Sequence, residues 1–185
     1  MPNRLLTLNS GMKKENMMEL ETTMTATHLR APRAAAIAGI LFAILLITSL
    51  WLIHLAVPAD PLEAGAWLQT RLNTVALALN LVPFSGIAFL WFIGVLRDRL
   101  GEREDRFFST VFLGSGLLFL AMLFMSAAMV GGLIIAYAVD PGRLLGSTTF
   151  TSARAIAYEI MNIYAIKMAG VFMIVTSTLA LRTGF

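Results

Sequence analysis

Five polar side chains lie in or beside long apolar runs of this 185-residue chain, where they are candidates for binding a ligand. They are two ionisable residues, one histidine and two amides: Glu159, Lys167, His54, Asn80 and Asn162. An ionisable group at membrane depth is costly, which makes it a candidate functional residue. Helical rise places all five toward the same end of the runs. Facing inward they would form a small polar pocket in the outer third of a bundle, and facing outward they would anchor it at the interface.

Lys167 and Glu159 also have a structural interpretation. Lys167 lies fifteen residues before Arg182, which is about 22 Å along a helix, so its apolar stem can carry the ammonium group to the outer interface. Glu159 would then lie at or beyond that interface. Glu159 and Asn162 share one stripe of the same helix, and we interpret this stripe as a helix contact in preference to a site.

Several chemistries have no visible residues in this chain. It contains no cysteine, so thiolate zinc sites and iron–sulfur clusters are excluded. Of the two histidines, His28 lies in the polar leader, which leaves His54 without a partner for haem. No metalloprotease, serine-hydrolase or P-loop pattern occurs. We therefore expect no cofactor, no metal site and no catalytic residues, and a protein that is not an enzyme.

Four long apolar runs determine the expected fold. The chain is 58% hydrophobic and only 14% charged, which excludes an ordinary soluble domain. Crossing a bilayer takes about 20 apolar residues as a helix, and uncharged runs of this length without polar alternation exclude a barrel. The sequence predicts an all-α, integral membrane four-helix up-and-down bundle in residues 34–185, after a mobile cytoplasmic leader at 1–33. The spans are expected at about 34–57, 74–96, 107–139 and 155–181.

The basic residues predict the orientation of these spans. The leader, the second connection and the C-terminal tail carry ten Lys and Arg residues, against three in the first and third connections. Because Lys and Arg are retained in the cytoplasm, both termini are expected there, in a bacterial inner membrane. Acidic residues interrupt the basic ones between Arg97 and Arg106, so nucleic acid is not an expected partner.

Small residues four apart predict where helices pack closely. Such spacing lets helix backbones approach in lipid, where no hydrophobic force brings them together. Pro83 should kink the second span and free the Leu79 carbonyl for Ser85 or for a polar group of another helix. The small residues form one seam in the first span and one in the third: Ala35, Gly39 and Ala43, and Ala128, Gly132 and Ala136.

Parts of the chain resemble a family of small multi-pass bacterial membrane proteins of unknown function. The resemblance rests on residues 161–172 (MNIYAIKMAGVF), on Ser177-Thr178, on Arg182-Thr183-Gly184 and on the start of the first span, residues 33–39. Members of that family continue past the Arg-Thr-Gly element with another hydrophobic helix, so the resemblance implies a shorter member or a truncated product. It implies no activity.

Two functions follow from these features. The first is a non-enzymatic structural or accessory subunit, which would associate through its small-residue seams with a second copy or with another membrane protein. The alternative is a small transporter or ligand-binding protein that uses the five polar residues in the outer third of the bundle. The lipid bilayer is an expected partner of both.

Overall fold

The structure, a computed structural model, describes residues 34–60, 65–100 and 106–183. It is 92% helical and has no strands within these ranges. The predicted leader at 1–33 and part of the second connection, residues 101–105, lie outside the described residues. The all-α prediction is confirmed.

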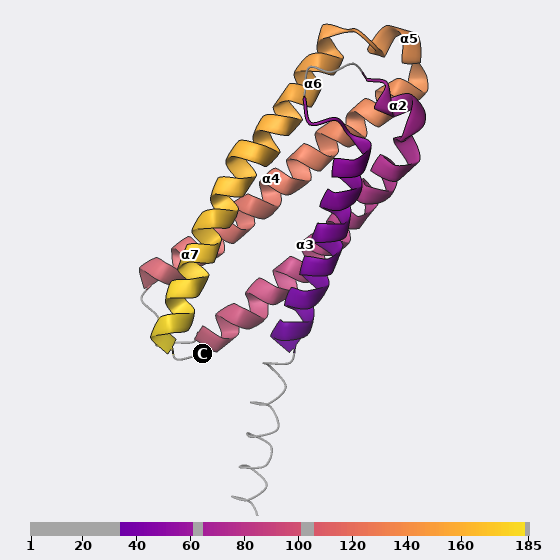
Figure 1. Ribbon diagram of the computed structural model, residues 1–185. Helices are drawn as coiled ribbons and strands as arrows, with labels where there is room; N and C mark the ends of the chain where they lie inside the picture. Colours follow the sequence, from indigo (N-terminus) through magenta and orange to yellow (C-terminus); the bar gives the residue numbers. More distant parts are fainter. Residues whose placement is uncertain (1–33, 61–64, 101–105, 184–185) are drawn as a thin grey trace, which may run out of the picture.

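Within the described residues, four helices are long and apolar enough to cross a membrane (Figure 1). The N-terminal helix, Ala34–Ala56, is followed by α3, Leu72–Leu100, and α4, Arg106–Val139. The fourth consists of three consecutive segments: α6, Thr148–Glu159; the π-helix η2, Ile160–Ala165; and α7, Ile166–Thr183. The chain is therefore a multi-pass membrane protein whose apolar helices contact lipid.

The fourth helix begins several residues before the predicted position of 155. Its first turn is capped by Ser147, whose hydroxyl accepts a hydrogen bond from the Phe150 backbone N–H at 3.1 Å. A serine at this position satisfies one of the amides that have no partner at a helix start. As a result, Arg154 lies within the helix rather than in the connection before it.

Two short helices stand at the same end of the molecule (Figure 1). α2, Trp67–Thr70, lies in the first connection, and α5, Pro141–Leu144, lies in the third. Asp140 caps α5 by accepting a hydrogen bond from the Arg143 backbone N–H at 3.0 Å, and Pro141 occupies the first turn. This arrangement ends α4 at Val139 and turns the chain back toward the bundle.

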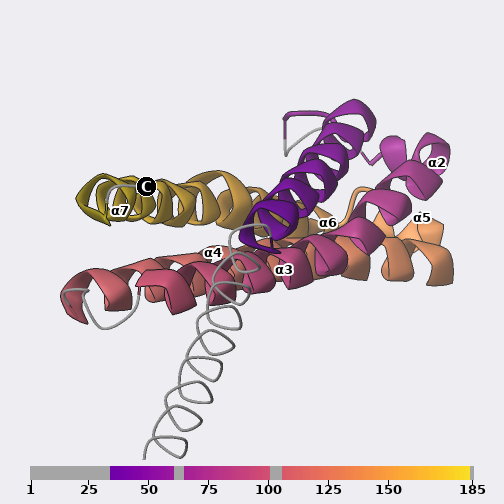
Figure 2. The same ribbon diagram turned by 90° about the horizontal axis from the view of Figure 1, so that it is seen from below.

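α4 lies at the centre of the bundle. It packs against α3 and against all three segments of the fourth helix. Seen from below, α3 and α4 form one layer, and the N-terminal helix and α7 lie apart from each other on the same side of it (Figure 2).

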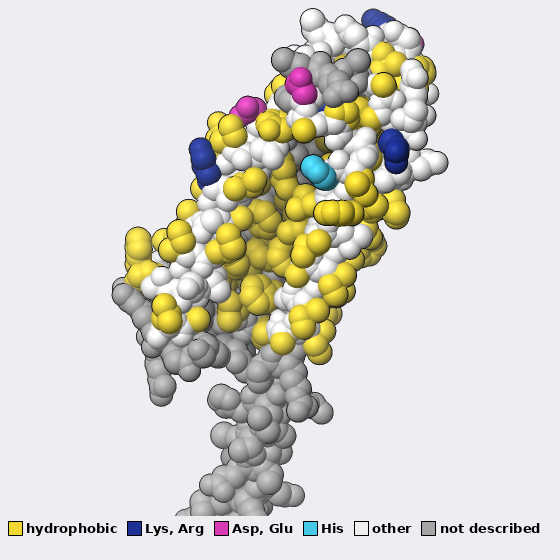
Figure 3. All heavy atoms as spheres, in the orientation of Figure 1, with side chains coloured by type: hydrophobic (Ala, Val, Ile, Leu, Met, Phe, Trp, Pro, Cys, Tyr) yellow, Lys and Arg dark blue, Asp and Glu magenta, His cyan; other side chains and the backbone are white. Residues whose placement is uncertain are grey.

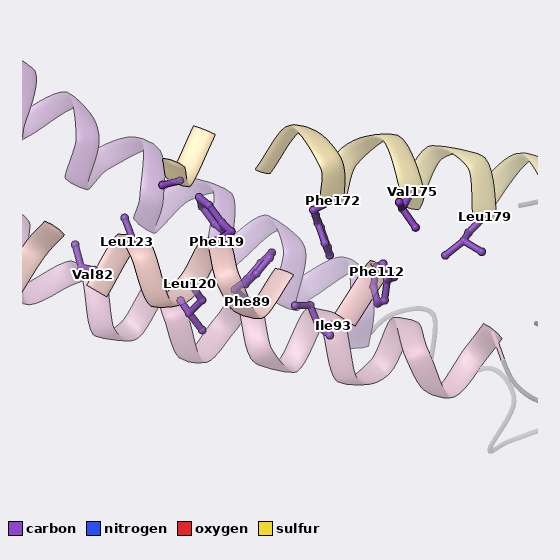
Figure 4. Packing of buried hydrophobic residues seen from close by; sticks show 11 residues of the cluster. Val82, Phe89, Ile93, Phe112, Phe119, Leu120, Leu123, Phe172, Val175 and Leu179 are labelled. Carbon is purple, nitrogen blue, oxygen red and sulfur yellow. The ribbon is translucent and has the colours of Figure 1, made fainter. Parts of the chain in front are cut away.

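Phe89 of α3 lies where the four long helices meet (Figure 4). Its ring centroid is 4.6 Å from that of Phe42 in the N-terminal helix, 5.5 Å from Phe119 in α4 and 5.2 Å from Phe172 in α7. The last two pairs meet edge to face, an arrangement that aromatic rings favour. This cluster holds the four helices together at mid-length, while the cavity described below lies nearer α2.

Candidate functional site: a cavity beside Trp67

A cavity of about 150 Å³ lies between the four long helices, on the side of α2. Figure 3 shows hydrophobic side chains running in a furrow between the N-terminal helix and α6–α7. The described lining comes from every long helix and from α2: Ser49, Leu50, Ile53, Val57, Pro58, Trp67, Leu79, Val82, Leu123, Ser126, Ala127, Val130, Leu133, Arg154, Ala157, Tyr158, Met161 and Asn162.

Two buried serines of the lining join neighbouring helices. Ser49 Oγ of the N-terminal helix donates a hydrogen bond to the Ala78 carbonyl of α3 at 2.8 Å. Ser126 Oγ of α4 donates to the Ala157 carbonyl of α6 at 2.9 Å. Hydroxyl-to-carbonyl bonds of this kind stabilise helix association in lipid. These two hydroxyls therefore position the walls of the cavity.

The bond from Ser49 lies close to the expected kink. α3 continues through Pro83, and the carbonyl that Ser49 reaches belongs to Ala78, the residue before Leu79. From Pro83 we expected a polar group of another helix to reach the Leu79 carbonyl. Ser49 is such a group, but it donates to the neighbouring carbonyl of Ala78. The Ser85 hydroxyl, named as the other candidate, is buried and has no hydrogen-bond partner among the described residues.

Arg154 is a lining residue that the sequence analysis missed. Only 5% of its surface is exposed, and its Nη2 donates a hydrogen bond to the Pro58 carbonyl at 2.9 Å. The fourth span was predicted to begin at about residue 155, which placed Arg154 just before it. The signal for a helix at this position was Ser147, a favourable N-cap residue seven positions earlier.

Trp67 of α2 lines the cavity and is itself almost fully buried. The residue is 4% exposed and packs in a cluster with Leu144 of α5 and Phe150 of α6. Its Nε1 is buried without any hydrogen-bond partner in the described part of the chain. An indole N–H can only donate, and leaving a buried donor unpaired costs about 1–3 kcal/mol.

The π-helix η2 places two further residues at the cavity. Met161 and Asn162 both belong to it and both line the cavity. The wider turn appears in the backbone as a hydrogen bond from the Ile166 N–H to the Met161 carbonyl, five residues earlier. Such turns inside α-helices are frequent at functional sites. Residues 155–165 contain neither Gly nor Pro, so the sequence offers no signal for this feature.

The five predicted site residues are not gathered in this cavity. His54, Asn80, Glu159 and Lys167 are exposed and do not line it. Asn162 is the one of the five that does, and its Nδ2 donates to the Tyr158 carbonyl of its own helix at 3.0 Å. Among the described residues, no group of three His, Cys, Asp or Glu side chains is placed to hold a metal ion.

The two predicted seams differ in their surroundings. A Cβ atom on Gly39 would lie 3.2 Å from Cδ2 of Phe92 in α3, so this glycine packs within the chain. In α4, the seam of Ala128, Gly132 and Ala136 is exposed, and a Cβ atom on Gly132 would meet nothing within 4 Å. The close approach inside α4 is made instead by Gly116, whose Cβ would lie 2.7 Å from Cδ1 of Ile93.

Comparison with known proteins identifies no relative, because no family model, curated protein or solved structure matches the chain. The function is therefore argued from the cavity and from the membrane-spanning helices themselves.

Proposed function

We propose that this protein is a non-enzymatic membrane protein that holds a small, largely apolar molecule in the cavity beside Trp67. The observation that carries the proposal is a cavity of about 150 Å³ between the four long helices. Apolar side chains from all four long helices surround the same space. Ligand sites typically combine such a lining with a few polar groups that fix orientation.

The polar groups of the lining disfavour a cation. Ser49, Ser126 and Arg154 already donate hydrogen bonds to backbone carbonyls. Arg154 is the single charged side chain in the described lining. A cation would find no carboxylate among the described residues of this lining, where a positive charge would be costly to bury.

We further propose that the protein lies in a bacterial inner membrane with both termini in the cytoplasm. The distribution of Lys and Arg supports this orientation. The connections that contain α2 and α5 then lie on the outer side, which places the cavity in the outer part of the bundle.

The test uses two matched substitutions in α4. Ala127 lines the cavity and is partly buried, whereas Ala121 of the same helix is exposed and lies outside the lining. The wild-type protein and the variants Ala127→Phe and Ala121→Phe are purified from membranes in mild detergent, and their intact masses are measured by native mass spectrometry. We expect one small molecule on the wild type and on Ala121→Phe, and its loss from Ala127→Phe.

A folding defect is separated from a filled cavity by a smaller change. Ala127→Leu adds less volume than Ala127→Phe, so its free energy of unfolding should stay closer to that of the wild type. It should still lower the fraction of protein that carries the bound molecule. Bare protein in every preparation, or the same bound mass in Ala127→Phe and Ala121→Phe, would contradict the proposal.

A second candidate function, a structural or accessory subunit, is supported by the exposed seam of α4. Ala128, Gly132 and Ala136 present small side chains on the surface, where another helix can approach closely. Gly132→Ile should abolish association with a second copy or a partner, as measured by cross-linking in native membranes. The matched control is Gly94→Ile in α3, because a Cβ atom on either glycine meets nothing within 4 Å. Equal cross-linking in both variants would exclude this role for the seam.

A further inference from the structure

The exposed residues of the lining show on which side the cavity reaches the surface. Leu50 of the N-terminal helix is 38% exposed, and Tyr158 of the fourth helix is 42% exposed. Asn162, one turn after Tyr158, is exposed as well, whereas the other described lining residues are buried or half-buried. The cavity therefore meets the surface between these two helices, and we call this side, bounded by Leu50, Tyr158 and Asn162, the lateral opening.

Packed side chains cover the end of the cavity nearest α2 and α5. Trp67 of α2 is buried in one cluster with Leu144 of α5 and Phe150 of α6. A Cβ atom on Gly65 would lie 2.7 Å from Cδ2 of Leu145 and 2.8 Å from Cζ of Phe150, so the first connection lies directly against the third connection and α6. Within the described residues, this end is closed by contacts between the connections.

The aromatic cluster covers the opposite end of the cavity. Val82 and Leu123 line the cavity and also belong to the core cluster around Phe89 (Figure 4). The rings of Phe42 and Phe172 pack against Phe89 from the N-terminal helix and from α7. α3 and α4 pack against each other in one layer behind the cavity (Figure 2). In the described part of the chain, the cavity is therefore uncovered at the lateral opening.

The lateral opening faces the bilayer. Leu50 lies within the first spanning helix six residues before its end at Ala56, about 9 Å along the helix axis, and Tyr158 lies within the fourth. Large apolar side chains near the opening are exposed, among them Ile47 and Ile156, and hydrophobic side chains continue along the furrow between the two helices (Figure 3). An exposed apolar surface on spanning helices is a surface that lipid covers.

We propose that the cavity is loaded sideways through the lateral opening, and that its ligand is an apolar molecule dissolved in the bilayer rather than in water. This inference rests on the proposed function and adds to it the source of the ligand and the route by which it enters. A charged molecule would have to lose its hydration to pass the apolar furrow, which is costly. A molecule that already resides in lipid enters the cavity without that cost.

The test uses two photoreactive reagents of similar size that reach the protein from different phases. Phenyl trifluoromethyl diazirine is neutral and dissolves in the bilayer, whereas its para-carboxylate stays in water. Each is irradiated with membrane vesicles that contain the full chain, with the carboxylate loaded on both sides, and labelled residues are identified by peptide mass spectrometry. The neutral reagent should label Val82 and Leu123, which line the cavity and are 3% exposed. The carboxylate should label neither, and Phe112, which is fully buried outside the lining, should stay unlabelled by both.

Substitutions at the lateral opening should change this labelling in opposite directions. Leu50→Trp narrows the opening and should lower the neutral label on Leu123 severalfold. Ile47→Trp is the matched control, because Ile47 is exposed on the same helix and does not line the cavity. Tyr158→Ala widens the opening and should raise the label on Leu123, whereas Tyr164→Ala, at an exposed residue outside the lining, should leave it unchanged.

The outcomes separate this inference from the proposed function. Equal labelling of Leu123 by both reagents, no labelling of it by the neutral reagent, or equal labelling in Leu50→Trp and Ile47→Trp overturns the lateral route. A misfolded variant is recognised by label on Phe112, and the comparison of Tyr158→Ala with Tyr164→Ala then decides. If a molecule is bound by the wild type and lost from Ala127→Phe while the carboxylate labels Leu123 as strongly as the neutral reagent, the inference alone fails. If the labelling is as expected but every preparation is bare protein, the proposed function fails and the lateral route stands.

Discussion

Arg154 Nη2 donates a hydrogen bond to the Pro58 carbonyl at 2.9 Å, although the two residues are 96 positions apart in the sequence. The bond joins the start of the first connection to α6, and both residues line the cavity. A buried guanidinium in a membrane protein must be paired with acceptors. This contact therefore fixes the end of the N-terminal helix relative to the fourth helix at the mouth of the site.

Removing the guanidinium should weaken this connection. Arg154→Leu loses a hydrogen bond from a charged donor, which is worth about 1.5–3 kcal/mol. We expect a lower thermal unfolding midpoint in mild detergent, partly restored in Arg154→Lys, which keeps the charge. Arg143→Leu is the control, because Arg143 is exposed on α5. Equal unfolding midpoints for Arg154→Leu and Arg143→Leu would show that the contact with Pro58 does not stabilise the fold.

Ser126 of α4 gives a second test of the cavity wall. Ser126→Ala removes the bond to the Ala157 carbonyl, and hydrogen bonds between membrane helices contribute about 0.6 kcal/mol and at most about 1.7 kcal/mol. The free energy of unfolding, measured in mixed detergent micelles, should fall by that amount. Thr178→Ala is the matched control, since its hydroxyl donates to the Ile174 carbonyl of its own helix. A larger loss of unfolding free energy in Thr178→Ala than in Ser126→Ala would contradict this prediction.

Two glycines of α4 should respond differently to the same substitution. A Cβ atom on Gly116 would lie 2.7 Å from Ile93 Cδ1 and 3.1 Å from Phe172 Cδ2, and both neighbours are buried. Overpacking of this kind costs about 1–3 kcal/mol. Gly114 has nothing within 4 Å, so Gly114→Ala should be neutral or gain up to about 1 kcal/mol from helix propensity. Both free energies of unfolding are measured side by side, and a Gly116→Ala variant as stable as Gly114→Ala would argue against this close contact.

The proposed orientation can be measured because the chain contains no native cysteine. A cysteine at Arg97, near the end of α3, should react with an impermeant maleimide only after the membrane is broken. A cysteine at Arg143, on α5 at the other end of the bundle, should react in intact cells. The reverse pattern of labelling would show that the protein has the opposite orientation, with the cavity on the cytoplasmic side.

Only part of the candidate site could be predicted from the sequence. Asn162 was chosen as a polar residue within an apolar run, and it does line the cavity. Trp67 and Arg154 fall outside the four predicted spans, so neither was predicted to be a site residue. Their burial depends on contacts with α5, α6 and the first connection, which are distant in the sequence.

The fold class was determined by composition alone. Each long apolar run must satisfy its backbone hydrogen bonds internally in lipid, so helices and their approximate extents follow from the residues within each run. Which faces of those helices meet was decided only by the tertiary structure. Helical periodicity shows which residues share one face of a helix, but it does not show which neighbouring helix that face meets. A uniformly apolar helix also has no polar face to mark its outer side. The packing around Phe89 and the unpaired donor of Trp67 are therefore properties of the assembled bundle.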